Sequence, residues 1–412
     1  MNKAPGALQP YGLSAFGFLI LYQASVVGSV QTIPVLTPWI AQSLPALQGM
    51  IGFFVSWVIL AALLCSGFVA VALHRAEAVR AGFVSIVVMA GGLAAITFSE
   101  SFLSFVFAGF CIGLSYAVVN PVGSQIVAGL GKDGRNNVLF SIKQSSVSIG
   151  AGGAGLLLPP AADWLGWHWA IGFMVVVTTV IAWFGWLARP RDVTIKFNRA
   201  RISLRDLIPF SAVVAFVKHP EGKRLAFASM TLSLTQYGTM AVYVVWLWGS
   251  LHVEAEVAGQ MFFVAMMGGI AGRLFWGYLA DLSQPARILK LQMTTGAVGA
   301  LAMAFMPSTI EHVWLWIFSA VLGFVPMSWS GILLSEVTRA GKSASDARQG
   351  IITMTSGVVV LFYMGGLTGP AIMSAVYLLT ESFRLGFAIF AVLFVVSLLL
   401  YSRRYETLHV AT

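Results

Sequence analysis

One lysine stands inside an otherwise apolar stretch, and it is the residue best placed to bind a charged ligand. Lys143 occurs in the sequence Ser-Ile-Lys-Gln-Ser-Ser at 141–146, about two turns after Arg135. Arg135 already supplies a basic residue at the start of that stretch, so Lys143 is not needed there. An ionisable group within a long apolar segment is a functional candidate by default. Lys143 could hold an anion or a bridging water; alternatively, its stem reaches back to the aqueous interface.

Neutral polar and aromatic side chains in other apolar stretches could complete a binding cavity. Each one alone is more typical of a hydrogen bond between helices than of a ligand contact. As a group, about half of them are expected to face a cavity. The candidate binding residues, besides Lys143, are Gln144, Tyr22, Gln23, Asn120, Gln236, Tyr237, Tyr243, Trp329 and Tyr363.

The residues needed for covalent, redox or metal chemistry are scarce. The two cysteines lie in apolar stretches, and the six histidines lie near predicted loops or the tail without metal-ligand spacing. No phosphate-binding glycine loop occurs, which excludes ATP as the energy source. The first-half stretches contain no buried carboxylate of the kind that proton-coupled cation exporters use. We therefore expect no enzyme activity, metal or cofactor; a membrane enzyme or a receptor is the remote alternative.

The elements that carry these residues are twelve apolar stretches, each long enough to cross a bilayer. The chain is 58% hydrophobic and 9% charged, whereas soluble proteins carry about 25% charged residues. A crossing needs about 20 apolar residues, and in lipid such a segment must be helical. The predicted helices are 11–36, 48–73, 79–98, 102–128, 137–161, 167–188, 223–250, 257–280, 287–306, 311–337, 347–376 and 382–402.

Basic residues gather in alternate connections between these stretches. They follow the even-numbered helices, whereas the odd connections carry mainly acidic residues, such as Glu100, Asp163 and Glu254. The positive-inside rule places the even connections and both termini in the cytoplasm. The net charge of +9 thus reflects topology and does not indicate nucleic-acid binding. We expect a multi-pass protein of the cell inner membrane, in contact with membrane lipid.

The long polar stretch in the middle of the chain separates two six-helix halves. We predict an N-terminal bundle at 1–188, a cytoplasmic linker loop at 189–222 and a C-terminal bundle at 223–412. An amphipathic piece around 202–217 could lie on the membrane surface. The linker is too short to fold as a regulatory domain.

A motif at the end of the eighth helix resembles the loop motif of the major facilitator superfamily. Residues 272–281 read Gly-Arg-Leu-Phe-Trp-Gly-Tyr-Leu-Ala-Asp, followed by Arg287. Gly277, Leu279, Ala280 and Asp281 match the family pattern, whereas Leu282 replaces its arginine. The first-half counterpart around Gly67 is degraded, because Val71 stands where the motif has aspartate.

This resemblance implies an all-α membrane protein of twelve transmembrane helices in two pseudo-symmetric six-helix bundles. It also implies a cytoplasmic gate in which charged side chains pair and separate. The alternative is that these residues only anchor helix ends at the interface. The gating candidates are Arg273, Gly277, Asp281, Arg287 and Glu336.

The resemblance also bears on the substrate. Cyanate-type permeases of the family carry a Lys-Gln pair before a glycine-rich fifth helix, as Lys143, Gln144 and residues 150–155 do here. We therefore expect a secondary transporter that moves a small organic anion, a carboxylate by preference, by alternating access. Uptake with proton symport or exchange for a counter-anion is the favoured mode. Efflux of amphipathic compounds is the alternative, and a monomer suffices for this family.

Overall fold

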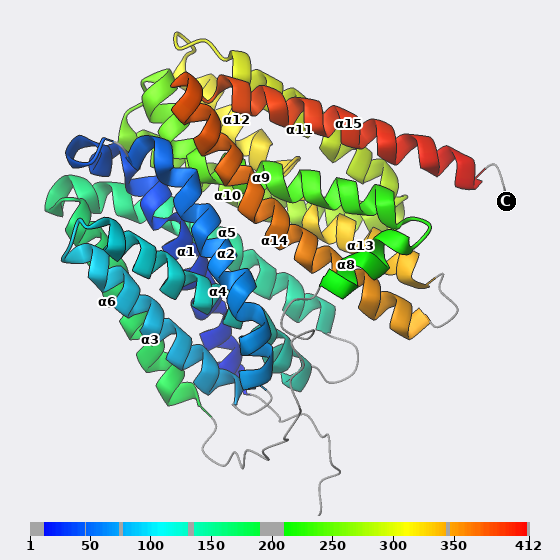
Figure 1. Ribbon diagram of the computed structural model, residues 1–412, viewed down its shortest axis with the longest axis horizontal. Helices are drawn as coiled ribbons and strands as arrows, with labels where there is room; N and C mark the ends of the chain where they lie inside the picture. Colours follow the sequence, from blue (N-terminus) through cyan, green and yellow to red (C-terminus); the bar gives the residue numbers. More distant parts are fainter. Residues whose placement is uncertain are drawn as a thin grey trace, which may run out of the picture. The chain divides into compact units, whose positions relative to one another are not determined.

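The computed structural model describes residues 12–45, 47–73, 77–130, 136–189, 210–342 and 347–409. Within these ranges it forms fourteen helices and no strand (Figure 1). The helices of the first half are α1 (Leu13–Ser43), α2 (Leu47–Leu73), α3 (Ala78–Thr97), α4 (Phe102–Leu130), α5 (Asn136–Leu165) and α6 (Trp167–Ala188). Those that follow are α8 (Phe210–Lys218), α9 (Gly222–Leu251), α10 (Ala255–Leu282), α11 (Pro285–Phe305), α12 (His312–Phe324), α13 (Ser330–Lys342), α14 (Ala347–Thr380) and α15 (Arg384–His409).

Nine helices of the described chain are long and apolar enough to cross a membrane: α1 to α4, α6, α10, α11, α14 and α15. Helices α5 and α9 are each 30 residues long but contain more polar residues. Helices α12 and α13, with 13 residues each, follow one another and together cover the remaining crossing. The twelve predicted crossings are thus all accounted for by helical segments.

The tenth crossing is interrupted, whereas the sequence pattern predicted one continuous helix over 311–337. Helix α12 ends at Phe324, and α13 begins only at Ser330. Pro326 lies in the break, where it lacks the N–H that a helix interior requires. The carbonyl of Phe324 accepts hydrogen bonds from Trp276 Nε1 at 2.8 Å and Ser328 Oγ at 2.8 Å. These side chains satisfy the backbone group that the break releases.

By its contacts the chain divides into two compact units. The first comprises Met1–Ile33 and Trp57–Ile208, and the second comprises Pro34–Ser56 and Pro209–Thr412. The end of α1 and the beginning of α2 therefore pack with helices of the second half. Gly52 donates its backbone N–H to Ser374 Oγ at 2.8 Å, and Ser56 Oγ donates to the carbonyl of Leu367 at 2.6 Å.

The boundaries predicted for the two bundles and the linker stay a prediction. Residues 190–209 of the linker lie outside the described ranges. Helix α8 covers 210–217 of the predicted amphipathic piece, and its residue Phe216 is fully buried.

In each unit, glycines let one pair of helix backbones approach closely. In the first unit, a side chain at Gly150 of α5 would collide with the carbonyl oxygen of Ala24 on α1. In the second unit, Gly369 of α14 stands in the same relation to Leu234 on α9. Helices α9 and α14 lie side by side (Figure 1). Counted by membrane crossing, the fifth helix (α5) packs on the first (α1), and the eleventh (α14) packs on the seventh (α9).

A second pair of contacts repeats in the same way. Gly113 of α4 packs against the carbonyl of Val58 on α2, and Gly323 of α12 packs against the carbonyl of Ala265 on α10. The fourth crossing (α4) therefore packs against the second (α2), and the tenth (α12) packs against the eighth (α10). The two shared patterns confirm that the halves are pseudo-symmetric.

Candidate functional site

Lys143 is buried in the first unit beside a neutral partner. It lies two turns into α5, and its side chain is about 4% exposed. Its Nζ donates a hydrogen bond to Oδ1 of Asn120 on α4 at 3.2 Å. Among the described residues, Lys143 forms no ion pair. The lysine therefore lacks a protein carboxylate that would balance its charge in this part of the chain.

The space for this lysine depends on a glycine. A methyl group at Gly123, one turn after Asn120 on α4, would collide with Cε of Lys143 and lie 3.1 Å from Nζ. The same methyl group would lie 3.2 Å from Leu19 of α1. Asn120 itself is exposed. The ammonium group is thus held in a narrow slot whose amide partner remains accessible to a ligand.

The other first-unit candidates are less directly joined to the lysine. In the described chain, neither Gln23 nor Gln144 hydrogen-bonds to Lys143; Gln144 is exposed, and Gln23 is buried. Oε1 of Gln23 has no hydrogen-bond partner among the described residues. A buried amide oxygen without a partner is costly. It therefore remains a candidate contact for water or substrate.

Tyr22 is fully buried and holds three helices together. Its hydroxyl shares a 2.5 Å hydrogen bond with Ser85 Oγ of α3 and donates to the carbonyl of Ser115 on α4 at 3.0 Å. Tyr243 on α9 is its counterpart in the second unit, where its hydroxyl and Ser319 Oγ of α12 are 2.8 Å apart. Both hydroxyls are used inside their own unit, and their role as substrate ligands stays a prediction.

The break between α12 and α13 borders a small recess in the second unit. Its volume is about 20 Å³, enough for one water molecule, and Gln236 contributes a polar group to a mostly apolar wall. Among the described residues, Oε1 of Gln292 and Nε1 of the buried Trp329 have no hydrogen-bond partner. Tyr237 and Tyr363 are half-buried on α9 and α14. The recess is lined by Thr235, Gln236, Thr239, Gly296, Ala300, Met303, Leu322, Pro326, Met327, Phe390 and Phe394.

A buried charge cluster joins the first turn of α9 to the end of α13. Glu336 is 2% exposed and pairs with Arg339 Nη2 at 3.0 Å and Arg224 Nη2 at 3.7 Å. Glu221 pairs with the same two arginines. The hydroxyl of Tyr401 on α15 donates to Glu336 Oε2 at 3.2 Å. The guanidinium carbon of Arg224 lies 4.6 Å from the centre of the Tyr401 ring. Two carboxylates and two guanidinium groups thus balance in charge.

Glu221 stands just before α9, and its pKa reflects the cluster. Burial by itself would raise the pKa of this carboxyl, but the charges and hydrogen bonds of Arg224 and Arg339 outweigh that effect. The pKa is therefore held below its ordinary value, and the folded protein favours the charged form.

Sequence reasoning selected only one member of this cluster, Glu336, as a gating residue. The remaining gating candidates lie elsewhere in the second unit. Gly277 of α10 has open space around it, Arg287 is exposed in the first turn of α11, and Arg273 is half-buried on α10. The side chain of Asp281 lies outside the described residues. The sequence signal for the missed members was the Glu221–Arg224 pair, spaced three residues apart at a helix start.

The sequence profile of the Major Facilitator Superfamily matches residues 14–363. The chain belongs to this superfamily. The resemblance seen in the motif after the eighth helix is confirmed at this level, and the protein is a multi-pass membrane protein of a transporter superfamily. The likeness to cyanate-type permeases stays a prediction. Among curated proteins, none matches the chain by sequence.

Solved structures of other transporters share the superfamily fold. A mutant of the nucleoside transporter NupG superposes with a TM-score of 0.72 at 15% identity, covering 95% of this chain and 99% of that one. A mutant of the peptide transporter POT gives 0.71 at 14% identity, covering 96% and 94%. A bacterial homolog of the human lysosomal transporter Spinster, in an inward-facing and unoccupied conformation, gives 0.67 at 15% identity, covering 94% and 95%. At these identities the likeness shows the fold alone.

Proposed function

We propose that this superfamily member is a secondary active transporter that moves a small organic anion, a carboxylate by preference, across the inner membrane. Lys143 binds the anion, and the protein works as a monomer by alternating access. Uptake is coupled to a proton or to exchange for a counter-anion. Both termini lie in the cytoplasm, as the distribution of basic loops indicates.

The observation that carries this proposal is the burial of Lys143 without a carboxylate partner in the described chain. A charge removed from water is costly unless an opposite charge and hydrogen bonds compensate it. The amide oxygen of Asn120 compensates only in part, since it is neutral. A carboxylate that enters beside the ammonium group supplies the missing charge, which favours binding of an anion.

The solved neighbours are named for nucleosides and peptides, which are small polar solutes. They support an organic solute of similar size in general terms. Lys143 narrows the class of solute proposed for this chain, because its positive charge disfavours cations and favours anions.

A binding measurement on the purified protein tests the proposal. Thermal melting in detergent would be followed with small carboxylates, inorganic anions, nucleosides, sugars and lipophilic cations, for the wild type, Lys143→Gln and Lys218→Gln. Lys218 is an exposed lysine at the end of α8 and serves as the matched control. A ligand that binds only the folded state raises the melting temperature by mass action. We expect a carboxylate to stabilise the wild type and Lys218→Gln but not Lys143→Gln.

The rival function is efflux of amphipathic compounds, and the 29 phenylalanines and 13 tryptophans of the chain would suit it. Stabilisation by lipophilic compounds alone, unchanged in Lys143→Gln, would replace the anion proposal with efflux. If a carboxylate binds, its uptake into proteoliposomes with and without a pH gradient separates proton symport from anion exchange.

A further inference from the structure

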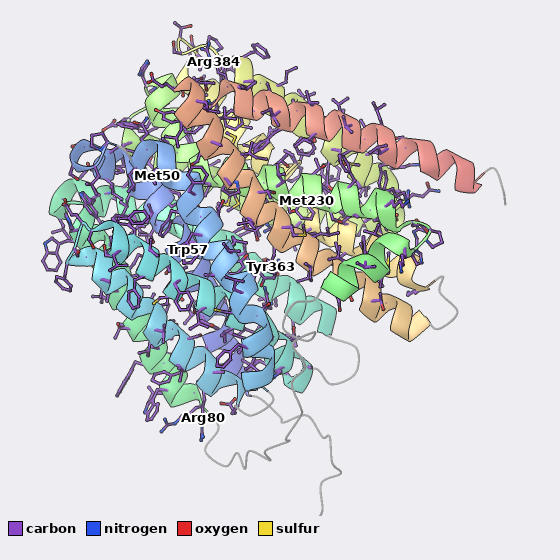
Figure 2. All side chains as sticks on the ribbon, viewed as in Figure 1. Met50, Trp57, Arg80, Met230, Tyr363 and Arg384 are labelled. Atoms are coloured by element: carbon purple, nitrogen blue, oxygen red, sulfur yellow. The ribbon has the colours of Figure 1, made fainter. Side chains whose placement is uncertain are left out.

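Two arginines of the first unit flank a recess at one end of α3 and α6. Arg80 lies in the first turn of α3, and Arg189 directly follows α6. The recess measures about 380 Å³. Figure 2 shows Arg80 at the end of the α3 ribbon, and α6 packs along α3. Its lining residues are Arg80, Phe83, Val84, Gly185, Trp186 and Arg189.

The lining side chains fall on one face of each helix. Arg80, Phe83 and Val84 follow a spacing of three and four residues, which places them on one stripe of α3. Trp186 and Arg189 are three residues apart on the facing stripe, and the rings of Phe83 and Trp186 lie 5.3 Å apart. The guanidinium carbon of Arg189 lies 3.0 Å from the centre of the Trp186 ring. One end of the recess is therefore basic and its wall is aromatic.

Neither arginine is neutralised by the described chain. The ion pairs found among the described residues do not include Arg80 or Arg189. Nε of Arg80 is buried and has no hydrogen-bond partner among those residues. The carboxylate nearest to Arg80 in the sequence, Glu77, caps α3 by accepting from the backbone N–H groups of Val79 and Arg80 at 2.8 Å each. Within the described residues, this end of the recess thus holds two guanidinium groups and no paired anion, which favours an anionic ligand.

Large apolar side chains on the same two helices are exposed. Val84 is 58% exposed and Trp186 is 43% exposed, and the neighbouring Trp183 and Leu187 are more exposed still. In a membrane-spanning bundle, such a surface meets acyl chains. Basic pockets between transmembrane helices are general binding sites for anionic lipid head groups.

We propose that the recess between α3 and α6 binds one anionic glycerophospholipid. Its phosphate accepts hydrogen bonds from Arg80 and Arg189, and an acyl chain lies over Val84 and Trp186. A helix-end arginine that serves only as an interfacial anchor needs no recess and does not choose among phospholipids. Selectivity for an anionic head group is thus the property that distinguishes the lipid site from simple anchoring.

Native mass spectrometry of the full-length protein, with graded amounts of phosphatidylglycerol or phosphatidylcholine, tests this proposal. We expect the wild type to retain phosphatidylglycerol in preference to phosphatidylcholine. Arg80→Gln and Arg189→Gln should each weaken the binding of phosphatidylglycerol about tenfold, as expected for the loss of one charged hydrogen bond. Arg384→Gln is the matched control, since Arg384 is an exposed arginine at the start of α15.

A second variant keeps both arginines. Val84→Glu places a carboxylate one turn from Arg80 on an exposed position, where it competes with the lipid phosphate. It should abolish the preference for phosphatidylglycerol and leave the helical circular dichroism spectrum unchanged. Equal retention of both lipids by the wild type would overturn the proposal, as would unchanged retention in the arginine variants. Displacement of the lipid by inorganic phosphate at equal concentration would show a site for soluble anions instead.

Discussion

The ammonium group of Lys143 donates a 3.2 Å hydrogen bond to the amide oxygen of Asn120. The lysine side chain has room to lie there because Gly123 has no side chain. Helix α5 thus supplies the cation, Lys143, and helix α4 supplies both the neutral acceptor, Asn120, and the space that Gly123 leaves open. Because Asn120 is exposed, a ligand can replace or extend this hydrogen bond without unfolding the pair.

The slot predicts that Gly123→Ala impairs anion binding by displacing Lys143. The added methyl group would collide with Cε, so the lysine must leave its present rotamer. Because Cε is near the end of a flexible side chain, it can move at little cost, and the effect falls on the position of the ammonium group. We expect the affinity for the carboxylate found in the melting assay to fall at least tenfold, which isothermal titration calorimetry can measure.

Gly153→Ala is the control for this variant, because Gly153 lies on α5 with open space around it. Alanine in place of glycine within a helix is stabilising by about 0.5–1 kcal/mol. Gly153→Ala should therefore keep its affinity and melt slightly higher than the wild type. Equal affinity in Gly123→Ala and Gly153→Ala would mean that the position of Lys143 does not matter for binding.

The charge cluster predicts that Glu336→Gln destabilises the second unit. Glu336 is buried and contacts both Arg224 and Arg339, so the neutral amide leaves two guanidinium groups with one carboxylate. Removing one partner of a buried pair costs about 3–5 kcal/mol, and the amide that replaces it recovers part of this. The melting temperature should fall clearly, whereas Glu254→Gln, at an exposed position, should leave it unchanged.

A double-mutant cycle separates this coupling from a general loss of packing. If the two residues act as a pair, Glu336→Gln combined with Arg224→Gln should be less destabilising than the sum of the single variants. Additive effects would contradict a coupled pair.

The same cluster predicts acid sensitivity that depends on Glu221. Its pKa is lower in the folded protein than in the unfolded chain, so the folded state releases the proton more readily. This contribution to stability is fully present above about pH 4.3, the ordinary pKa of glutamate, and is lost as the pH falls through the lowered value. The groups that face Glu221 are Arg224 and Arg339, with Glu336 beside them.

Melting temperatures measured from pH 6 down to the acid range check this prediction. The wild type and Glu254→Gln should lose stability on acidification more steeply than Glu221→Gln, which has no carboxyl group to protonate at that position. Parallel curves for wild type and Glu221→Gln would show that the cluster does not favour the charged form.

Sequence patterns predicted the helices well because each crossing must be long, apolar and internally hydrogen-bonded. They did not predict the break at Pro326, because the surrounding apolar run is continuous and the hydrogen bonds of Trp276 and Ser328 to the break form only in the folded bundle. Lys143 was found from its isolation in an apolar stretch. Its glycine slot could not be found, because Gly123 and Lys143 belong to different helices and meet only in the packed bundle.

The paired tyrosines predict a structural effect without a binding effect. Tyr22 hydrogen-bonds to Ser85 and Ser115, and Tyr243 hydrogen-bonds to Ser319, all within their own units. Each Tyr→Phe variant removes only a hydroxyl, and a buried hydrogen bond contributes about 0.5–1.5 kcal/mol. Tyr22→Phe and Tyr243→Phe should therefore both lower the melting temperature modestly and keep the affinity for the substrate anion. A large loss of affinity at unchanged melting temperature would instead place that hydroxyl on the substrate.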